Sequence, residues 1–489
     1  MTTDVPTAPS GDGPTLRRGA VSFGGVLFQS ITFMAPAIAT ALSIPAGIAF
    51  SGGAAPLSVI LALVASLIAA NSIGQLAKHL PSAGSFYTFV SHGIHPKVGF
   101  LVAWGFLLGV IVGGPFLALQ MGFVVANTTN AEWGWSTDTW WIWTVLVCLL
   151  VFALGYRGIT GSTRAGMLLG AFEIVVFVGI SLTLIVKAGG DNTLQVFGTH
   201  YANNPDYQGF SGVIAGSVFT ILAFIGFEQA APIAEEAHEP RRTVPRAIIV
   251  ACLVIGLFYI LNTYASSVSF GPDKMTGFVS AGDSNPWQNV LGRDAWGWVG
   301  FWLIFLALVN SVIANQNAAN NSATRTMFAM GRIRLLPEGF GRLNPFGSPL
   351  LAMVAQLVFS LVVALYLGFH YDPYTGFAMT ATILVDIFAP MYILLNIACL
   401  MYYLRFRRDE FNLLLHGILP VLGALAFIPA FFAGAGIPAF SFISSLPSPL
   451  SYAGPVAAIW MVIGIVYLVA LSQRSPDRIL ETKRVFDEE

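Results

Sequence analysis

The chain alternates long apolar runs with short polar segments, and this pattern predicts a bundle of membrane-spanning helices. Each run is near or above the roughly 20 apolar residues that an α-helix needs to cross a bilayer. The runs lie near 22–49, 56–77, 97–127, 140–156, 166–187, 211–235, 246–268, 297–331, 349–369, 376–403, 412–434 and 453–472. We therefore expect an all-α integral membrane protein with twelve transmembrane helices.

The positive charges sort by side when these twelve runs are threaded through a membrane. With the N-terminus inside, all the lysines and arginines fall on the inner side except Lys187, Lys274 and Arg293. An excess of lysine and arginine marks cytoplasmic loops. The sorting predicts a multi-pass protein of the plasma (inner) membrane with its N- and C-termini in the cytoplasm.

Composition narrows the class of protein further. The mean hydropathy is +0.74, and 10% of residues are charged, whereas soluble domains carry about 25%. No basic cluster with interleaved aromatic residues points to nucleic acid as a partner. No paired metal ligands, phosphate-binding glycine loop or nucleophile–base spacing is visible, so we expect no enzyme activity, no cofactor and no metal.

The domain organisation follows from the same pattern. Residues 1–19 are rich in proline, glycine and threonine, and we expect them to form a disordered cytoplasmic tail. Residues 20–472 form a single transmembrane domain, and residues 473–489 form a cytoplasmic C-terminal tail. The inner segment 78–97 is half apolar, which predicts a short amphipathic helix along the cytoplasmic face.

The first and sixth runs each contain a helix breaker at a matching depth. Pro36 interrupts the first run, and Gly226, followed by Pro232, interrupts the sixth. Proline removes a backbone donor and glycine weakens a helix. Interrupted helices at corresponding places in two halves point to a transporter built of inverted repeats. The alternative is a simple kink, since proline and glycine are common in membrane helices.

Three stretches carry a resemblance to a known family. LAKHLPSAGSFYTFV follows the second run, FIGFEQAAPIAEEAHEPRRTVPRAI spans the exit of the sixth, and NSATRTMFAMGRIRLLP ends the eighth. These stretches resemble the amino acid–polyamine–organocation permeases, of the bacterial amino acid permease type. The resemblance covers about residues 20–472, and the stretch in the sixth run is its most specific part.

The resemblance implies the leucine-transporter-type fold, with a five-plus-five inverted repeat, two extra helices, and helices 1 and 6 broken. Repeat one would cover about 22–187, repeat two about 211–403, and the extra helices about 412–472. Substrate would bind at mid-membrane between helices 1 and 6, with helices 3, 8 and 10 lining the site. The predicted substrate-binding residues are Ala35, Pro36, Ala37, Ala39, Thr40, Phe224, Ile225, Gly226, Phe227, Asn310, Asn317 and Asp386.

Two positions depart from relatives in this family. Many members have Gly-Ser-Gly-Ile in helix 1, where this chain has Ala-Ile-Ala-Thr at 37–40, which leaves the substrate open. Some proton-coupled relatives carry a lysine in helix 5, and the matching position here is Glu173. A charged carboxylate in a bilayer costs about 2.5–3.5 kcal/mol on insertion scales, so Glu173 is a candidate proton-coupling residue. The alternative is an acid paired with a cytoplasmic arginine.

The remaining polar residues each allow two roles. Glu228 either braces the interrupted turn of helix 6 or takes part in proton coupling, and Asp386 either meets an ammonium group or faces an outer vestibule. At the end of the sixth run, acidic residues alternate with arginines: Glu235, Glu236, Glu239, Arg241, Arg242 and Arg246. They form either a solvated salt-bridge cluster or an inner gate. The amides crowding the eighth run suggest a wet helix face or packing between helices.

Together these features favour a secondary active transporter for an amino acid or related amine, working by alternating access as a proton-coupled symporter. Its partners would be that small-molecule substrate, protons and the lipid bilayer. A polyamine or ethanolamine carrier and an amino acid exchanger are alternatives. A passive channel or facilitator is the competing class. The sequence leaves the oligomeric state open.

Overall fold

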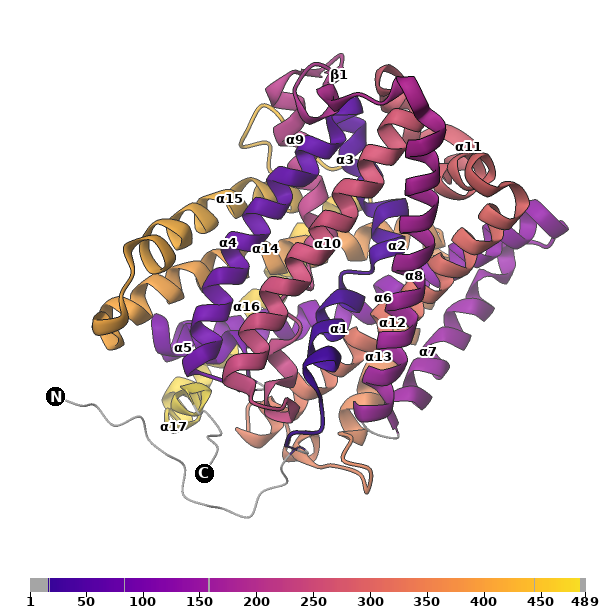
Figure 1. Cartoon of the computed structure of the whole chain (residues 1–489). Helices are drawn as coiled ribbons and strands as arrows, with labels where there is room; N and C mark the ends of the chain where they lie inside the picture. Colours follow the sequence, from indigo (N-terminus) through magenta and orange to yellow (C-terminus); the bar gives the residue numbers. More distant parts are fainter. Residues whose placement is uncertain (1–15, 17, 83, 157–158, 444, 484–489) are drawn as a thin grey trace.

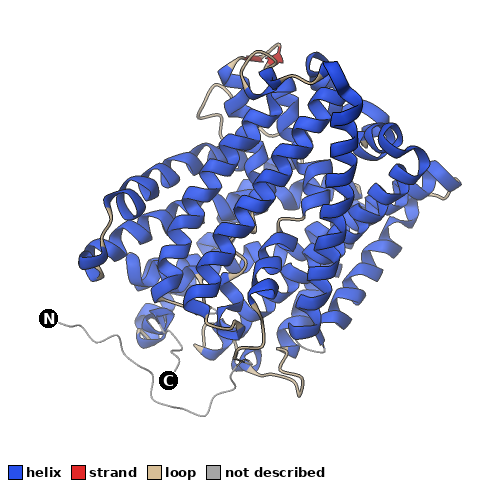
Figure 2. Ribbon diagram, viewed as in Figure 1, coloured by secondary structure: helices blue, strands red, loops and turns tan. Residues whose placement is uncertain are grey.

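The structure is a computed structural model that describes residues 16, 18–82, 84–156, 159–443 and 445–483. Most of the expected tail at 1–19, and residues 484–489 of the tail at 473–489, lie outside these described residues. Helices make up nearly all of the described chain, and Figure 2 shows them as one bundle. The only named strands in the described part, β1 (Asn203–Asn204) and β2 (Tyr207–Gln208), pair antiparallel at one end of the bundle.

Within the described residues, ten long helices form the body of the bundle. They are α4 (Ala55–His79), α6 (Pro96–Trp133), α7 (Trp140–Tyr156), α8 (Ile159–Ala188), α10 (Pro240–Phe270), α12 (Arg293–Arg332), α13 (Leu350–His370), α14 (Pro373–Phe406), α15 (Leu419–Gly434) and α16 (Ala453–Arg474). Seven shorter helices connect or extend them: α1 (Phe23–Phe33), α2 (Pro36–Ile38), α3 (Ile44–Ser51), α5 (Phe86–Gly93), α9 (Phe210–Thr220), α11 (Ala281–Ser284) and α17 (Asp477–Leu480).

Local signals in the sequence fix several helix ends. Proline opens α6, α10 and α14, where its missing N–H group would have no partner in any case. The Asp372 side chain accepts the N–H of Thr375 and so caps α14. Gly134 ends α6 with a left-handed backbone, at φ 68°.

The described residues contain ten stretches long and apolar enough to cross a membrane. The first and second expected runs appear as one continuous stretch, Phe23–His79, and the sixth contains the shorter apolar helix Phe210–Phe224. The chain is therefore a multi-pass membrane protein. The expected number of twelve spans stays a prediction.

Burial separates the central helices from the lipid-facing ones. Among the 18 most apolar consecutive residues of α6, 78% are buried. In the stretch Leu450–Arg474, which contains α16, 22% of the corresponding residues are buried. The core of the bundle therefore surrounds α6, and α16 turns apolar side chains outward, as a lipid-facing helix must. The start of α1 and the short helix α17 lie at the same end of the bundle, opposite β1 (Figure 1).

The segment expected to form an amphipathic helix at 78–97 contains α5. This helix is buried on nearly every face, because α6 and α14 pack against it. The chain after α16 also packs here, since the Ser91 hydroxyl donates to Thr482 Oγ1 at 2.8 Å. Part of the expected C-terminal tail is therefore built into this end of the bundle.

Candidate substrate site

The first expected span contains a non-helical step between α1 and α2, which we call the first interruption (Met34–Ala35). Ala35 has a left-handed backbone, at φ 49°, and Pro36 cannot donate a hydrogen bond. Two side chains from other helices cap the start of α2. The Ala37 N–H donates to Glu173 Oε2 of α8 at 3.0 Å, and the Ile38 N–H donates to Ser311 Oγ of α12 at 3.3 Å. These two N–H groups are thus already occupied.

The sixth expected span contains a longer non-helical segment, which we call the second interruption (225–230). It follows α9 and a 3-10 helix at Ile221–Phe224. Gly226 has φ 118°, and a Cβ there would lie 2.3 Å from Phe33 Cδ1, so only glycine fits. Glu228 folds back onto this turn and accepts from the Gly226 N–H at 3.1 Å.

Two further donors complete the shell around Glu228. The Tyr392 hydroxyl of α14 donates to Oε2 at 2.8 Å, and Gln229 Nε2 donates to Oε1 at 2.8 Å. The carboxylate is fully buried. These bonds tie the second interruption to α14, and a bracing role for Glu228 requires such bonds.

Tyr259 of α10 joins the two interruptions directly. Its hydroxyl lies 2.7 Å from the Met34 carbonyl oxygen and 3.0 Å from the Ala223 carbonyl oxygen. A second link runs from the Ala230 N–H to Ser30 Oγ of α1 at 3.0 Å. Tyr259 could not be singled out from the sequence, because one tyrosine in an apolar helix is usually a packing residue.

A cavity of about 50 Å³ lies between the two interruptions, α6, α12 and α14. Its lining is mostly apolar, and none of its lining residues is charged. The polar lining groups include Gln120 of α6 and Asn315 of α12. Gln120 Oε1 and Asn315 Oδ1 are buried and have no hydrogen-bond partner within the described chain. This central cavity therefore offers two unused, neutral acceptors beside apolar walls.

Only part of the predicted site lines this cavity. Ala35, Ala39 and Ile225 do. The other predicted residues do not line it: Pro36, Ala37, Thr40, Phe224, Gly226, Phe227, Asn310, Asn317 and Asp386.

Three of these have other visible roles or positions. Asn310 Nδ2 donates to the Leu169 carbonyl of α8 at 2.6 Å. Asp386 lies on the same helix as the lining residues Leu384 and Phe388, but it contacts Gly434 of α15. Thr40 Oγ1 donates to the Pro36 carbonyl at 2.7 Å, within its own helix. Their predicted contact with substrate stays a prediction.

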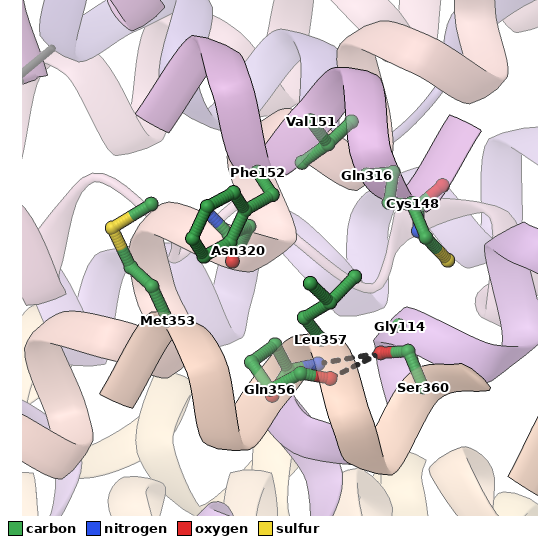
Figure 3. A pocket seen from close by; sticks show the side chains of 10 residues that line it. All are labelled: Gly114, Cys148, Val151, Phe152, Gln316, Asn320, Met353, Gln356, Leu357 and Ser360. Carbon is green, nitrogen blue, oxygen red and sulfur yellow. Dashed lines mark hydrogen bonds between the residues drawn. The ribbon is translucent and has the colours of Figure 1, made fainter. Parts of the chain in front are cut away.

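A second, smaller cavity of about 20 Å³ lies on the other side of α12, among α6, α7 and α13 (Figure 3). Gln316, Asn320 and Gln356 line it, and each has a buried polar atom without a partner in the described structure. A polar cavity of this size can hold a water molecule. The amide-rich helix α12 therefore faces two cavities, with Asn315 on one and Gln316 and Asn320 on the other.

The 3-10 helix Ala231–Glu236, which follows the second interruption, is held by ion pairs to α12. Glu236 pairs with Arg325 at 3.1 Å, and both side chains are almost fully buried. Glu235 pairs with Arg332 at 2.7 Å. The sequence suggested partners among the neighbouring arginines 241–246, and one such pair is present: Arg242 lies 3.8 Å from Glu239, with both side chains exposed. The strongest pairs are therefore long-range.

Fold and site together define a helical membrane protein with a buried cavity between two interrupted spans. A family model described as amino acid permease matches residues 25–442, and the chain belongs to this family. The family is one of transporters, in agreement with the expectation that the chain is not an enzyme.

Several curated proteins are similar to the chain. The uncharacterized amino-acid permease C359.01 of Schizosaccharomyces pombe is 28% identical over 360 residues, which cover 71% of this chain and 59% of that protein. The general amino-acid permease GAP2 of Candida albicans is 27% identical over 321 residues, covering 64% and 53%. The low-affinity putrescine importer PlaP of Escherichia coli is 26% identical over 437 residues, covering 86% of each chain. The chain thus spans somewhat over half the length of the fungal relatives.

Proposed function

We propose that this chain is a secondary active transporter that carries an amino acid across the plasma membrane by alternating access, as a proton-coupled symporter. The observation that carries the substrate class is the central cavity. It has apolar walls and two unpartnered amide oxygens, from Gln120 and Asn315, and no charged lining residue. A zwitterion has no net charge to compensate, and its ammonium group can donate to both amide oxygens.

The fold we infer is the five-plus-five inverted repeat, with twelve spans, helices 1 and 6 broken, and both chain ends in the cytoplasm. The left-handed Ala35 and the positive φ of Gly226 support it, because they lie five spans apart at matching depths. Irregular backbone at membrane depth is tolerated where protein buries it or where it lines a cavity.

A polyamine carrier is the second candidate, and the 86% overlap with a putrescine importer favours it. A doubly charged amine would, however, bring two positive charges into a cavity without a lining carboxylate. Coulomb energies are large where the surroundings are apolar, so the central cavity favours the amino acid.

A ligand panel on the purified protein tests the substrate class. A neutral amino acid should raise the melting temperature, because binding to the folded state adds RT ln(1 + [L]/Kd) to stability. Putrescine and ethanolamine should have little effect. Stabilisation by putrescine alone would favour the polyamine carrier.

A variant of Asn315 tests the site itself. Asn315→Leu removes one amide acceptor, and a hydrogen bond to a charged group is worth about 1.5–3 kcal/mol. We expect the Kd for the amino acid to rise by about tenfold to a hundredfold. Asn320→Leu is the matched control, because Asn320 lines the second cavity, and it should leave the Kd nearly unchanged.

The proposed coupling residue is Glu173. Its carboxylate accepts the Ala37 N–H at the start of α2, where a negative charge is favoured by the helix dipole. Protonation would weaken this cap and so shift the balance between two arrangements of the first interruption. Glu228 is the second candidate, but its donors support the bracing role better.

Uptake into liposomes tests the coupling. Wild-type protein should concentrate substrate under an inward proton gradient, and a protonophore should abolish this. Glu173→Gln should still bind and exchange substrate but lose the accumulation. Accumulation by Glu173→Gln at the wild-type level would leave Glu173 a structural cap, and uptake unaffected by the protonophore would favour a passive facilitator.

A further inference from the structure

Asp386 of α14 differs from the other buried acids whose contacts are described above. Its side chain is 5% exposed, and neither carboxylate oxygen has a hydrogen-bond partner in the described part of the chain. By contrast, Glu173 accepts a backbone N–H, Glu228 accepts from three donors, and Glu236 pairs with Arg325. A charged Asp386 would therefore be uncompensated where the others are not.

The surroundings of Asp386 are unfavourable for a negative charge. A Cβ placed on Gly434 would lie 2.7 Å from Asp386 Oδ1, so the carboxyl group lies against the last residue of α15. The C-terminal end of a helix carries a partial negative charge. Nearby, Val218 of α9, Ala389 of α14 and Ala430 of α15 form a small apolar cluster.

No cationic side chain among the described residues offsets this environment. Neither α9, α15 nor the segment 435–452 contains a charged residue. The other helices that pack on α14 carry their charged and imidazole groups near their ends. These groups are Lys78 and His79 on α4, His92 on α5, Lys97 and Glu132 on α6, His370 on α13, Arg474 on α16, and Arg408, Asp409, Glu410 and His416 in the helical turns 408–410 and 413–418, with Arg405 at the end of α14 itself.

Three ligands could neutralise a lone carboxylate: a metal cation, an organic ammonium group or a proton. A metal cation such as Ca²⁺ needs several oxygen ligands, and the described residues contain no group of three or more acidic, histidine or cysteine side chains that could hold one. A substrate ammonium group in the central cavity would not meet Asp386, because Asp386 does not line that cavity. A proton needs neither extra ligands nor space.

We propose that Asp386 is a proton-binding site, occupied while the end of α15 packs against α14 as it does here. The neutral acid is compatible with apolar surroundings, whereas the unpaired carboxylate is not. Release of the proton would require water at the contact between α14 and α15. Proton occupancy and the closure of this contact are therefore linked, since a proton that binds one arrangement better favours that arrangement. This inference stands apart from the proposed transport activity.

Infrared difference spectroscopy on the purified full chain tests the site directly. Wild-type protein at neutral pH should show the C=O stretch of a protonated carboxylic acid, and Asp386→Asn should lose one such component. Asp372→Asn is the matched control, because it makes the same change on the same helix at an exposed N-cap that asparagine also satisfies. This control should keep the component, and an unchanged spectrum in Asp386→Asn would overturn the proposal.

The pH dependence of the melting temperature gives a second readout. An aspartate in the unfolded chain has lost its proton at neutral pH, while the folded protein would hold it, so raising the pH should lower stability. Asp386→Asn should show a shallower fall than wild type from about pH 5, where an unfolded aspartate has already lost most of its proton, up to neutral pH, and Asp372→Asn should match wild type. Identical slopes in Asp386→Asn and wild type would contradict a bound proton.

A second variant and a change of buffer cation complete the test. Should Asp386→Asn fail to fold, Asp386→Glu retains a titratable acid and should shift the carboxylic acid component, and an unshifted component would contradict the assignment. Replacing choline by sodium in the buffer separates the proton from a metal cation. Sodium-dependent stabilisation that Asp386→Asn loses would overturn the proposal in favour of a cation site.

Discussion

The two interruptions satisfy their exposed backbone groups in different ways. At the first interruption the acceptor is Glu173, which lies 136 residues away from Ala37 in the sequence. At the second it is Glu228, which lies two residues from Gly226. Buried N–H groups must be paired in either case. The second interruption is thus partly self-sufficient, whereas the first depends on how α8 and α12 are placed.

This difference assigns different consequences to similar substitutions. A change at the second interruption should disturb the local turn and the stability of the fold. A change at the partners of the first interruption should mainly alter how α2 is held, and so the balance between conformations.

Gly226→Val should have the largest effect. A Cβ at this position would lie 2.3 Å from Phe33, and the φ of 118° is strained for any residue with a side chain. Overpacking and backbone strain together should cost about 2–6 kcal/mol. Thermal unfolding measures this loss. Gly74→Ala is the control, because its nearest neighbours lie at 3.7 Å, and comparable losses in the two variants would contradict the tight approach between the interruptions.

Glu228→Gln should destabilise the protein more than Glu173→Gln. The Glu228 carboxylate accepts hydrogen bonds from Gly226, Gln229 and Tyr392, so the amide N–H₂ of a glutamine would face a donor and leave it unpaired, at a cost of about 1–3 kcal/mol. In Glu173→Gln the amide oxygen can still accept the Ala37 N–H. The melting temperatures of the two variants measure these costs. A larger fall in melting temperature for Glu173→Gln would show that the first interruption contributes more to stability than the second.

Tyr259→Phe should weaken the link between the interruptions without unfolding the protein. Removal of the hydroxyl leaves the Met34 and Ala223 carbonyl oxygens without this donor, at a cost of about 1–3 kcal/mol. We expect lower stability and weaker substrate binding. Tyr264→Phe makes the same change on α10, where the hydroxyl contacts Asn192, and should leave binding intact. Equal binding by both variants would argue against a positioning role for Tyr259.

Ser311→Ala should have the smallest effect of the four. It removes one acceptor from the Ile38 N–H at 3.3 Å, while Glu173 still caps α2, so we expect a loss of about 0.5–1.5 kcal/mol. Ser266→Ala is the control, since that hydroxyl bonds only to the Thr263 carbonyl of its own helix. If Ser311→Ala lowered the stability as much as Glu228→Gln, the expected difference between the two interruptions would be wrong.

The class of protein and the approximate position of most spans follow from the sequence alone, which also predicts interruptions near residues 36 and 226. These features depend on local composition: apolar runs long enough for a bilayer, proline at 36 and glycine at 226. The family membership rests on motifs of the same local kind. The brace between Glu228 and Gly226 was also within reach of the sequence, because both residues belong to one turn.

Packing between helices determines which polar residues face the central cavity. Asn310, Asn315, Gln316, Asn317 and Asn320 are spread around α12, so the sequence cannot say which of them turns inward. Packing against α6 and α8 sets the rotation of α12, and it brings Asn315 rather than Asn310 to the central cavity. The same packing gives Glu235 and Glu236 their distant arginine partners. Local pattern fixes where a helix lies in the chain, but only contacts between helices fix the direction each side chain faces.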